Sequence, residues 1–519
     1  MNQGESSPTE LVFGLVGPLG TDLTAVATVL KDALARVEYR CEVHRLSQLM
    51  HDLTGAPWDQ LKEGYRDEEI AAHMTAGNEL RRRLGRQDAM ALLGIMAIQE
   101  LRQRLEDESS KRVTRLAHVL HSLKRPEEVK TLREIYGPAL VVLAAYSPRE
   151  KRRLDLAKRI AESHSRNQSA EFGAKADELL KRDEAELADP CGQDVEETFP
   201  VADVFINTSD PASMTKSINR AIDLLFGNVF ITPAQDEQGM YLARCGAFRS
   251  SSLARQVGAA ICRPDGTIVA LGMNDVPKAG GGAYWSDGGG DDGRDFQLGH
   301  DTSDKMRENI FAEILERLGS AGWLDAAKAE QKVNDLVREA LREGERPFMK
   351  GAQFLGTIDY VRAVHAEMAA ITDAARHGQS TVGCTLYTTT FPCHDCAKHI
   401  VAAGISRVVY VEPYRKSLVE DLYPDSVEVD PMHSSGKKVT FEPFVGVAPR
   451  RYSDFFDISS TKRKNKDGSV KQWRPAGAVP RLPEYLPMAL ARLSAERLET
   501  QVFLDQLKSM GLAKNEEQN

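Results

Sequence analysis

The stretches His365-Ala366-Glu367 and Pro392-Cys393-His394-Asp395-Cys396 decide how the second half of this chain folds. His365 and Glu367 can serve one pocket only if a helix begins about there, because residues two apart on a regular helix point to different sides. Cys393 and Cys396 are spaced to share one face of a helical turn that starts after Pro392. The spacing therefore predicts two helices whose first turns face each other.

These side chains have the chemistry of a zinc site. Thiolate and neutral imidazole are ligands that Zn²⁺ prefers, so His365, Cys393 and Cys396 supply three ligands. A catalytic zinc keeps its fourth position for water, whose pKa falls from about 15.7 to about 7. Glu367 is then placed to move a proton from this water to a substrate. The combination H-x-E with P-C-x-x-C is a general signature of zinc nucleobase deaminases.

A second interpretation is a purely structural zinc site. Structural zinc is held by four protein ligands, and either Cys384 or His394 could complete the set. In that case Glu367 would have no catalytic work.

Short apolar runs around these motifs predict a mixed sheet. Pro264-Asp265-Gly266 is a hairpin turn signal between two runs, and later runs alternate with the two expected helices. The order is hairpin, helix, strand, helix, strand. The expected strands are Arg255–Cys262, Thr267–Met273, Thr385–Thr389 and Arg407–Val411.

A glycine-rich stretch interrupts this unit. Residues 279–295 hold seven glycines and four aspartates, a composition that predicts an irregular loop. The acids could hold Mg²⁺ bridged to a triphosphate, whereas the simpler interpretation is a solvated loop. They are Asp287, Asp291, Asp292 and Asp295.

The beginning of the chain predicts a separate α/β unit. An apolar strand at Leu11–Val16 enters the turn Gly17–Gly20, and a helix follows over Leu23–Leu34. Further strands are expected at Ala139–Ala145 and Ala202–Ile206, separated by long charged helical stretches. This alternation is typical of a parallel sheet with helical crossovers.

The turn after the first strand lies where a phosphate loop would, and its N–H groups could cradle a nucleotide through Gly17, Gly20, Thr21 and Thr24. Against G-x-x-x-x-G-K-[ST], however, Asp22 replaces the second glycine and Leu23 replaces the lysine. The pattern therefore favours regulatory nucleotide binding or a structural role over phosphoryl transfer.

Bulk properties limit the partners. A length of 519 residues predicts two domains, and a net charge of -9 with 7% aromatic residues disfavours a nucleic-acid substrate. Neither a secretory signal nor a membrane span is visible, and seven sparse cysteines favour the reducing cytoplasm. Residues 462–474 hold six basic residues and one acid, which indicates a solvated linker or, alternatively, an RNA contact.

Two further motifs carry a family resemblance. Val257-Gly258-Ala259 and Gly272-Met273-Asn274, followed by the zinc motifs, resemble the deoxycytidylate deaminase branch of the cytidine deaminase superfamily over roughly 236–457. The resemblance implies a three-layer α/β/α domain, a homo-oligomer, and Asn274 in contact with the sugar of the substrate. The chain departs from the small members by about ninety residues inserted between Asn274 and His365.

The whole chain resembles the two-domain anti-phage dCTP deaminases, in which a degenerate P-loop nucleotide-kinase-like domain precedes the deaminase. The stretches that carry this resemblance are His121–Glu128, Gly192-Gln193, Lys278–Trp285 and Arg294-Asp295-Phe296, with Lys181–Glu184 as part of a kinase lid. The implied domains are 9–228, 236–457 with an inserted loop at 275–360, and a basic linker with a helical tail at 458–519.

That resemblance implies zinc-dependent hydrolysis of dCTP and dCMP to dUTP and dUMP plus ammonia, which depletes a phage of a DNA precursor. It also implies that a small RNA can hold the enzyme inactive. Two other hypotheses remain: a housekeeping dCMP deaminase regulated by nucleotide at the N-terminal domain, or a deaminase of tRNA or single-stranded DNA.

Overall fold

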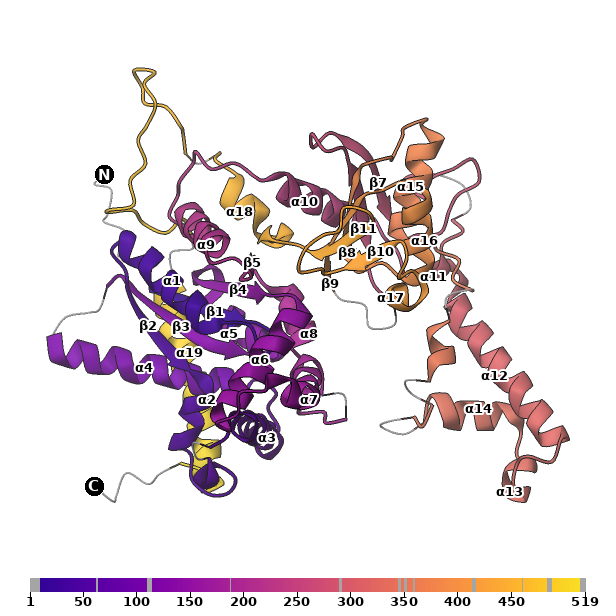
Figure 1. Ribbon diagram of the computed structural model, residues 1–519, viewed down its shortest axis with the longest axis horizontal. Helices are drawn as coiled ribbons and strands as arrows, with labels where there is room; N and C mark the ends of the chain where they lie inside the picture. Colours follow the sequence, from indigo (N-terminus) through magenta and orange to yellow (C-terminus); the bar gives the residue numbers. More distant parts are fainter. Residues whose placement is uncertain are drawn as a thin grey trace. The chain divides into compact units, whose positions relative to one another are not determined.

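The computed structural model contains two units, each built on its own six-stranded sheet (Figure 1). It describes residues 10–513 except 62–63, 110–113, 187, 289–291, 344–346, 350–351, 358–359, 413–416, 460 and 483–487. Unit 1 comprises residues 1–238, 430–434 and 443–519, and unit 2 comprises residues 239–429 and 435–442. No helix in the described part has the length and apolar character needed to cross a membrane.

The sheet of unit 1 is parallel except at one edge. Its order is β12-β5-β4-β1-β3-β2, and only the short β12 runs antiparallel to its neighbour. The central strand β1 is completely buried, as expected of a strand covered on both faces. The strands are β1 (Leu11–Val16), β2 (Arg40–Arg45), β3 (Leu116–Leu123), β4 (Leu140–Tyr146), β5 (Val204–Asn207) and β12 (Gly446–Val447).

Helices cover both faces of this sheet. One face packs against α1 and α9, whose apolar side chains join those of β1 and β4 in one core. On the other face, α4 contacts β3 and α5 contacts β4. The helices are α1 (Leu23–Arg36), α3 (Arg66–Leu84), α4 (Ala89–Ser109), α5 (Pro126–Tyr136), α6 (Arg149–Ser163), α7 (Gly173–Glu184) and α9 (Pro211–Leu225), with the short α2 (Leu46–Leu49) and α8 (Val195–Thr198).

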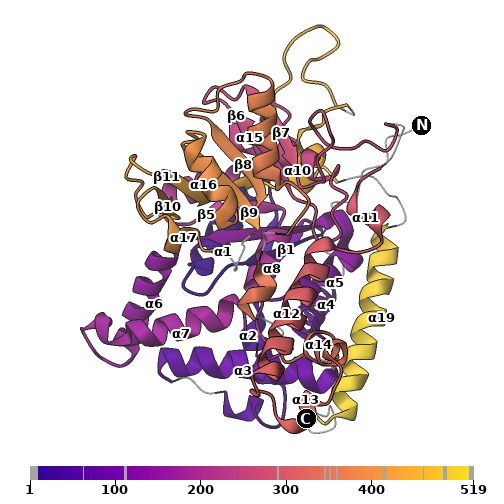
Figure 2. The ribbon, with the colours of Figure 1, turned by 90° about the vertical axis from the view of Figure 1, so that its right-hand side faces the viewer.

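The C-terminal helix α19 (Met488–Ser509) is part of unit 1, against the expectation of an accessory tail (Figure 2). It packs on α4 and α5, and its Phe503 is fully buried. Arg102 of α4 bonds Glu496 of α19 at 2.7 Å and Glu10 before β1, also at 2.7 Å. The predicted boundary after residue 457 therefore differs from the structure, because β12 and α19 both complete the first unit.

The sheet of unit 2 has the order β10-β11-β9-β8-β6-β7. The predicted hairpin is confirmed: β6 and β7 are antiparallel, and Gly266 turns between them with φ +86°. β8 then pairs with β6 antiparallel and with β9 parallel. The strands are β6 (Gly258–Cys262), β7 (Ile268–Met273), β8 (Thr385–Thr390), β9 (Arg407–Glu412), β10 (Val427–Val429) and β11 (Val439–Pro443).

Two glycines let helices lie directly on opposite faces of this sheet. A Cβ at Gly258 would lie 1.9 Å from the Ala243 carbonyl of α10 (Gln235–Ala247). A Cβ at Gly272 would lie 2.0 Å from the Ala366 carbonyl of α15 (Ala366–Arg376). Successive residues of a strand face opposite sides, and Gly272 pairs with Ala259, the neighbour of Gly258. The hairpin therefore lies between α10 and α15 as the middle of three layers.

Unit 2 also contains α16 (His394–Ala402) and the short α17 (Val419–Leu422), and unit 1 contains the short α18 (Tyr452–Phe456).

The inserted segment is helical, so the expectation of a loop over 275–360 is wrong for much of its length. Asp301 caps α12 by accepting from the N–H groups of Ser303 and Asp304, a local signal for a helix start. Phe311 of α12 and Val337 of α14 then pack into a small core. The helices are α11 (Asp295–Leu298), α12 (Thr302–Ser320), α13 (Ala326–Ala329) and α14 (Val333–Leu341).

The largely buried ion pair between Arg102 of α4 and Glu496 of α19 is expected to stabilise the packing of α19 on α4. Replacing Glu496→Gln weakens the contact to a guanidinium that is 13% exposed, so we expect a loss of about 2–3 kcal/mol in the free energy of unfolding of unit 1. Urea unfolding followed by circular dichroism measures it. The control is Glu499→Gln on the same helix, where the Glu499 side chain is 39% exposed and pairs with Arg86; it should lose less than about 1 kcal/mol. Equal losses in both variants would contradict this account.

Candidate metal centre

The first turns of α15 and α16 bring three metal-ligating side chains together (Figure 2 shows the two helices side by side). His365 is the N-cap residue of α15, and Cys393 is the N-cap residue of α16. Both predicted helix starts are therefore confirmed. Three ligand atoms lie within 4.8 Å of one another, one each from His365, Cys393 and Cys396.

The separations fit one tetrahedral ion. His365 Nδ1 lies 3.3 Å from Cys393 Sγ and 3.4 Å from Cys396 Sγ. Zinc bonds of about 2.0–2.3 Å at tetrahedral angles place neighbouring ligand atoms about 3.5 Å apart. The donor set and its spacing therefore suit Zn²⁺, with Nδ1 as the ligating nitrogen of the imidazole.

Neither candidate for a fourth protein ligand joins this group. Cys384 precedes β8 and Cys393 follows it, so about 20 Å of extended strand separates them. His394 is the first residue of α16, and its ring lies outside the group of three donors. Among the described residues, the His, Cys, Asp and Glu side chains supply three ligands, which leaves one position of a tetrahedral site for another molecule.

Local electrostatics favour the thiolate form of Cys393. Contact with Cys396 and with His365 lowers the pKa of the Cys393 thiol to about 4. The Cys396 N–H also points at Cys393 Sγ, at 3.4 Å, in the first turn of α16. The unbonded N–H groups at this helix end carry partial positive charge, which stabilises an anionic sulfur.

Glu367 lies beside the three donors and is 4% exposed. Its Oε2 is 3.4 Å from Cys396 Sγ, and its Oε1 accepts from the Thr388 hydroxyl at 3.3 Å. Burial raises the pKa of the Glu367 carboxyl above its ordinary value. A raised pKa makes the carboxylate a stronger base, which suits a group that accepts a proton during catalysis.

Asn274 follows β7 near the same centre, but its side chain is already bonded to the backbone. Its Oδ1 accepts from the Val257 N–H at 2.7 Å, and its Nδ2 donates to the Arg255 carbonyl at 2.7 Å. In this structure Asn274 therefore fixes the loop that leads into β6. A contact with the sugar stays a prediction.

The three described loop acids do not form a group of metal-ligating side chains. Asp292 pairs with Arg294 at 2.6 Å, and Asp295 pairs with Arg362 at 2.7 Å. Asp287 is exposed, and Asp291 lies outside the described residues. None of the described acids belongs to a group of metal-ligating side chains like the one at His365.

The glycine turn of unit 1 is bonded to its own protein neighbours. The Leu19 N–H donates to Asp183 Oδ2 at 2.7 Å, and the same carboxylate pairs with Lys124 at 2.8 Å. A Cβ at Gly20, which has φ +89°, would lie 2.8 Å from Arg152. One N–H group of the turn thus already binds an anionic side chain, and Gly20 serves close packing against α6.

The other predicted loop residues have separate surroundings. Gly17 is packed closely as well, since its Cβ would lie 2.9 Å from the Leu23 side chain. Thr21 is buried, and the Thr24 hydroxyl accepts from Arg45 at 3.3 Å.

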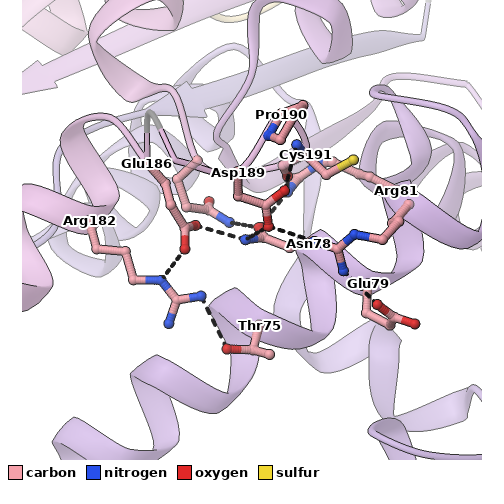
Figure 3. A network of polar contacts seen from close by, with 12 residues as sticks. Thr75, Asn78, Glu79, Arg81, Arg182, Glu186, Asp189, Pro190 and Cys191 are labelled. Carbon is pink, nitrogen blue, oxygen red and sulfur yellow. Dashed lines mark hydrogen bonds and ion pairs between the residues drawn. The ribbon is translucent and has the colours of Figure 1, made fainter. Parts of the chain in front are cut away.

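The predicted lid segment at Lys181–Glu184 is tied to α3 (Figure 3). Arg182 donates to Thr75 of α3 at 3.1 Å and to Glu186 at 2.8 Å. Asn78 of α3 donates to Glu186 at 2.7 Å and to Asp189 at 3.1 Å. In this structure, hydrogen bonds of its own side chains therefore hold the segment against α3 and against the glycine turn.

Comparison with known proteins agrees with the geometry of unit 2. Residues 233–412, about a third of the chain, match the family described as the cytidine and deoxycytidylate deaminase zinc-binding region. This region is similar to deaminase zinc-binding domains. All three metal-ligating side chains, together with Glu367, lie inside the matched residues.

Individual relatives match shorter parts. Deoxycytidylate deaminase of Enterobacteria phage T2 is 52% identical over 54 residues, which are 10% of this chain and 29% of the phage protein. Deoxycytidylate deaminase of Homo sapiens is 30% identical over 118 residues, 22% of this chain and 60% of the human protein. The chain thus spans less than a third of the phage relative and less than two thirds of the human one.

Among solved structures, the dCMP deaminase of cyanophage S-TIM5 aligns with 41% of this chain and 100% of its own, at 17% identity and a TM-score of 0.21.

The close approach at Gly272 generates a prediction for unit 2. In Gly272→Ala the new methyl would meet the backbone of α15, so His365 must move and bound zinc should fall well below one ion per chain. The thermal unfolding midpoint should fall too. In the control Gly319→Ala, within α12, the nearest atom is an ordinary 3.6 Å away. The measurement is the zinc content of both variants by mass spectrometry. Full zinc occupancy in Gly272→Ala would contradict the account.

Proposed function

We propose that the chain is a zinc-dependent hydrolase that deaminates deoxycytidine nucleotides, dCTP and dCMP, to the corresponding deoxyuridine nucleotides and ammonia. The observation that carries the proposal is the group of three donors with the buried Glu367 beside it. The names of the relatives, deoxycytidylate deaminases of a phage and of Homo sapiens, support a deoxycytidine nucleotide as substrate.

In this mechanism His365, Cys393 and Cys396 hold the ion, and Glu367 moves the protons. Bound Zn²⁺ supplies Lewis-acid chemistry that makes a water molecule a nucleophile at neutral pH. Glu367 would accept one proton of this water and deliver it to the pyrimidine ring nitrogen as the water oxygen bonds to C4. It would then carry the second proton, from the new C4 hydroxyl, to the amine. The C4–N bond would break, the C4 oxygen would become the carbonyl, and the amine would leave as ammonia.

The biological role we propose is the depletion of deoxycytidine nucleotides during phage infection, with a small RNA as inhibitor. In this role Mg²⁺ binds as the counter-ion of the dCTP triphosphate. The net charge of -9 supports a free nucleotide over tRNA or single-stranded DNA.

Product analysis tests the proposal directly. Purified protein is incubated with dCTP, dCMP, CTP, deoxycytidine and a cytosine-bearing oligonucleotide, and the products are separated by chromatography. We expect dUTP and dUMP, and an unchanged oligonucleotide. A result in which none of the nucleotides is deaminated would refute the proposed function, and deamination of the oligonucleotide alone would favour a nucleic-acid deaminase.

The role of Glu367 gives a second prediction. Glu367→Gln keeps the size of the side chain but cannot accept a proton, so kcat should fall by roughly 10²–10⁴-fold while zinc stays bound. The measurement is steady-state deamination of dCMP together with zinc content. Retained activity in a folded, zinc-loaded variant would show that Glu367 is not the proton carrier.

For unit 1 we propose either a sensing role or a structural role. In the sensing role, unit 1 binds a nucleotide at Gly17, Gly20, Thr21 and Thr24. The absent lysine and the Asp183 contact to the Leu19 N–H support this over kinase activity. Incubation with γ-labelled ATP and deoxynucleoside monophosphates should therefore give no labelled diphosphate, whereas a nucleotide kinase run in parallel should. Label transfer by the purified chain would overturn this assignment.

A further inference from the structure

Glu367 needs an orienting partner, because its carboxylate is buried away from bulk water. Two side chains contact its oxygens: Cys396 Sγ lies 3.4 Å from Oε2, and the Thr388 hydroxyl lies 3.3 Å from Oε1. In the proposed enzyme Cys396 is a ligand of the metal, and a ligating thiol has lost its proton. Its sulfur then offers no hydrogen bond to the carboxylate, so the Thr388 hydroxyl is the remaining side-chain donor among the described residues.

Thr388 is built rigidly into the sheet. It lies in β8, is 0% exposed, and pairs with Ala259 of β6 and Tyr410 of β9. Leu386, two residues earlier on the same face, belongs to the same hydrophobic core as Ala366 of α15. Thr388 therefore faces the helix that carries Glu367, from a central strand of the sheet.

The next threonine on this face helps to hold the hydroxyl in place. Thr388 Oγ1 is 3.0 Å from the Thr390 carbonyl, and Thr390 itself donates to Glu412 of β9 at 3.1 Å. A threonine hydroxyl has one proton, so it donates either to the ionised Glu367 carboxylate or to the Thr390 carbonyl. When the carboxyl is protonated, the hydroxyl can accept from it and donate to the carbonyl at the same time. The strand end thus fixes an oxygen at hydrogen-bond distance from Glu367.

From this geometry we infer that Thr388 is a positioning residue that sets the orientation of the Glu367 carboxyl for proton transfer. The inference rests on the proposed function. General acid–base catalysis requires the carboxyl within hydrogen-bond reach of the proton it moves, and small displacements of a catalytic group lower the rate steeply. Thr388 touches neither the metal ligands nor the substrate in this role; it acts through Glu367.

The test compares two substitutions at one position. Thr388→Val keeps the shape of the side chain and removes the hydroxyl, whereas Thr388→Ser keeps the hydroxyl. We expect kcat for dCMP to fall roughly 10- to 100-fold in Thr388→Val, as for loss of a hydrogen bond to a charged group, with KM and zinc content near those of the unmodified chain. Thr388→Ser should recover kcat to within about threefold.

Thr372→Val is the control, because Thr372 lies on α15 with an exposed side chain that donates to carbonyls of its own helix. Its kcat should not change. Unchanged kcat in Thr388→Val would overturn the inference. Loss of zinc together with equal decreases of kcat in Thr388→Val and Thr388→Ser would also overturn it, because this result indicates a role in packing alone. Failure of the proposed function is distinguishable, since the unmodified chain would then deaminate nothing.

Discussion

The close contact between the first turns of α15 and α16, over a sheet position without a side chain, is the constraint on which the rest of unit 2 depends. Gly272 allows the backbone of α15 to lie against β7, and this places His365 opposite Cys393 and Cys396. Both helix N-termini then point their free N–H groups toward the same small volume. An anionic donor set and a positive end of each helix stabilise one another there, so fold and site have the same origin.

Much of this could be predicted from sequence because the motifs carry their own geometry. The H-x-E and P-C-x-x-C spacings each require a helix start, and the structure has N-caps at His365 and Cys393. Thr388 escaped prediction, because its role comes from a strand register and not from a motif. The helical insertion was missed because the glycine stretch before it dominates the composition, although Asp301 is a good cap for α12.

In unit 1, local sequence patterns predict less of the structure than they do in unit 2, because tertiary contacts decide more of it. The strand, turn and helix at its start were predictable, yet β2 and β3 were not, since β2 is largely charged and β3 contains two histidines. The turn looks like a phosphate loop by spacing, whereas its surroundings show Asp183, Lys124 and Arg152 bonded to it. Long-range hydrogen bonds of this kind leave no trace in a single sequence.

The coordination of the metal tests the central claim most directly. X-ray absorption at the zinc edge, on protein purified with its metal, measures how many sulfur and light atoms surround the ion. The open three-ligand site predicts two sulfur atoms at about 2.3 Å and two nitrogen or oxygen atoms at about 2.0–2.1 Å, one of them from an exchangeable water. Three or more sulfur atoms, or two imidazoles with no water, would show a closed structural site and contradict the account.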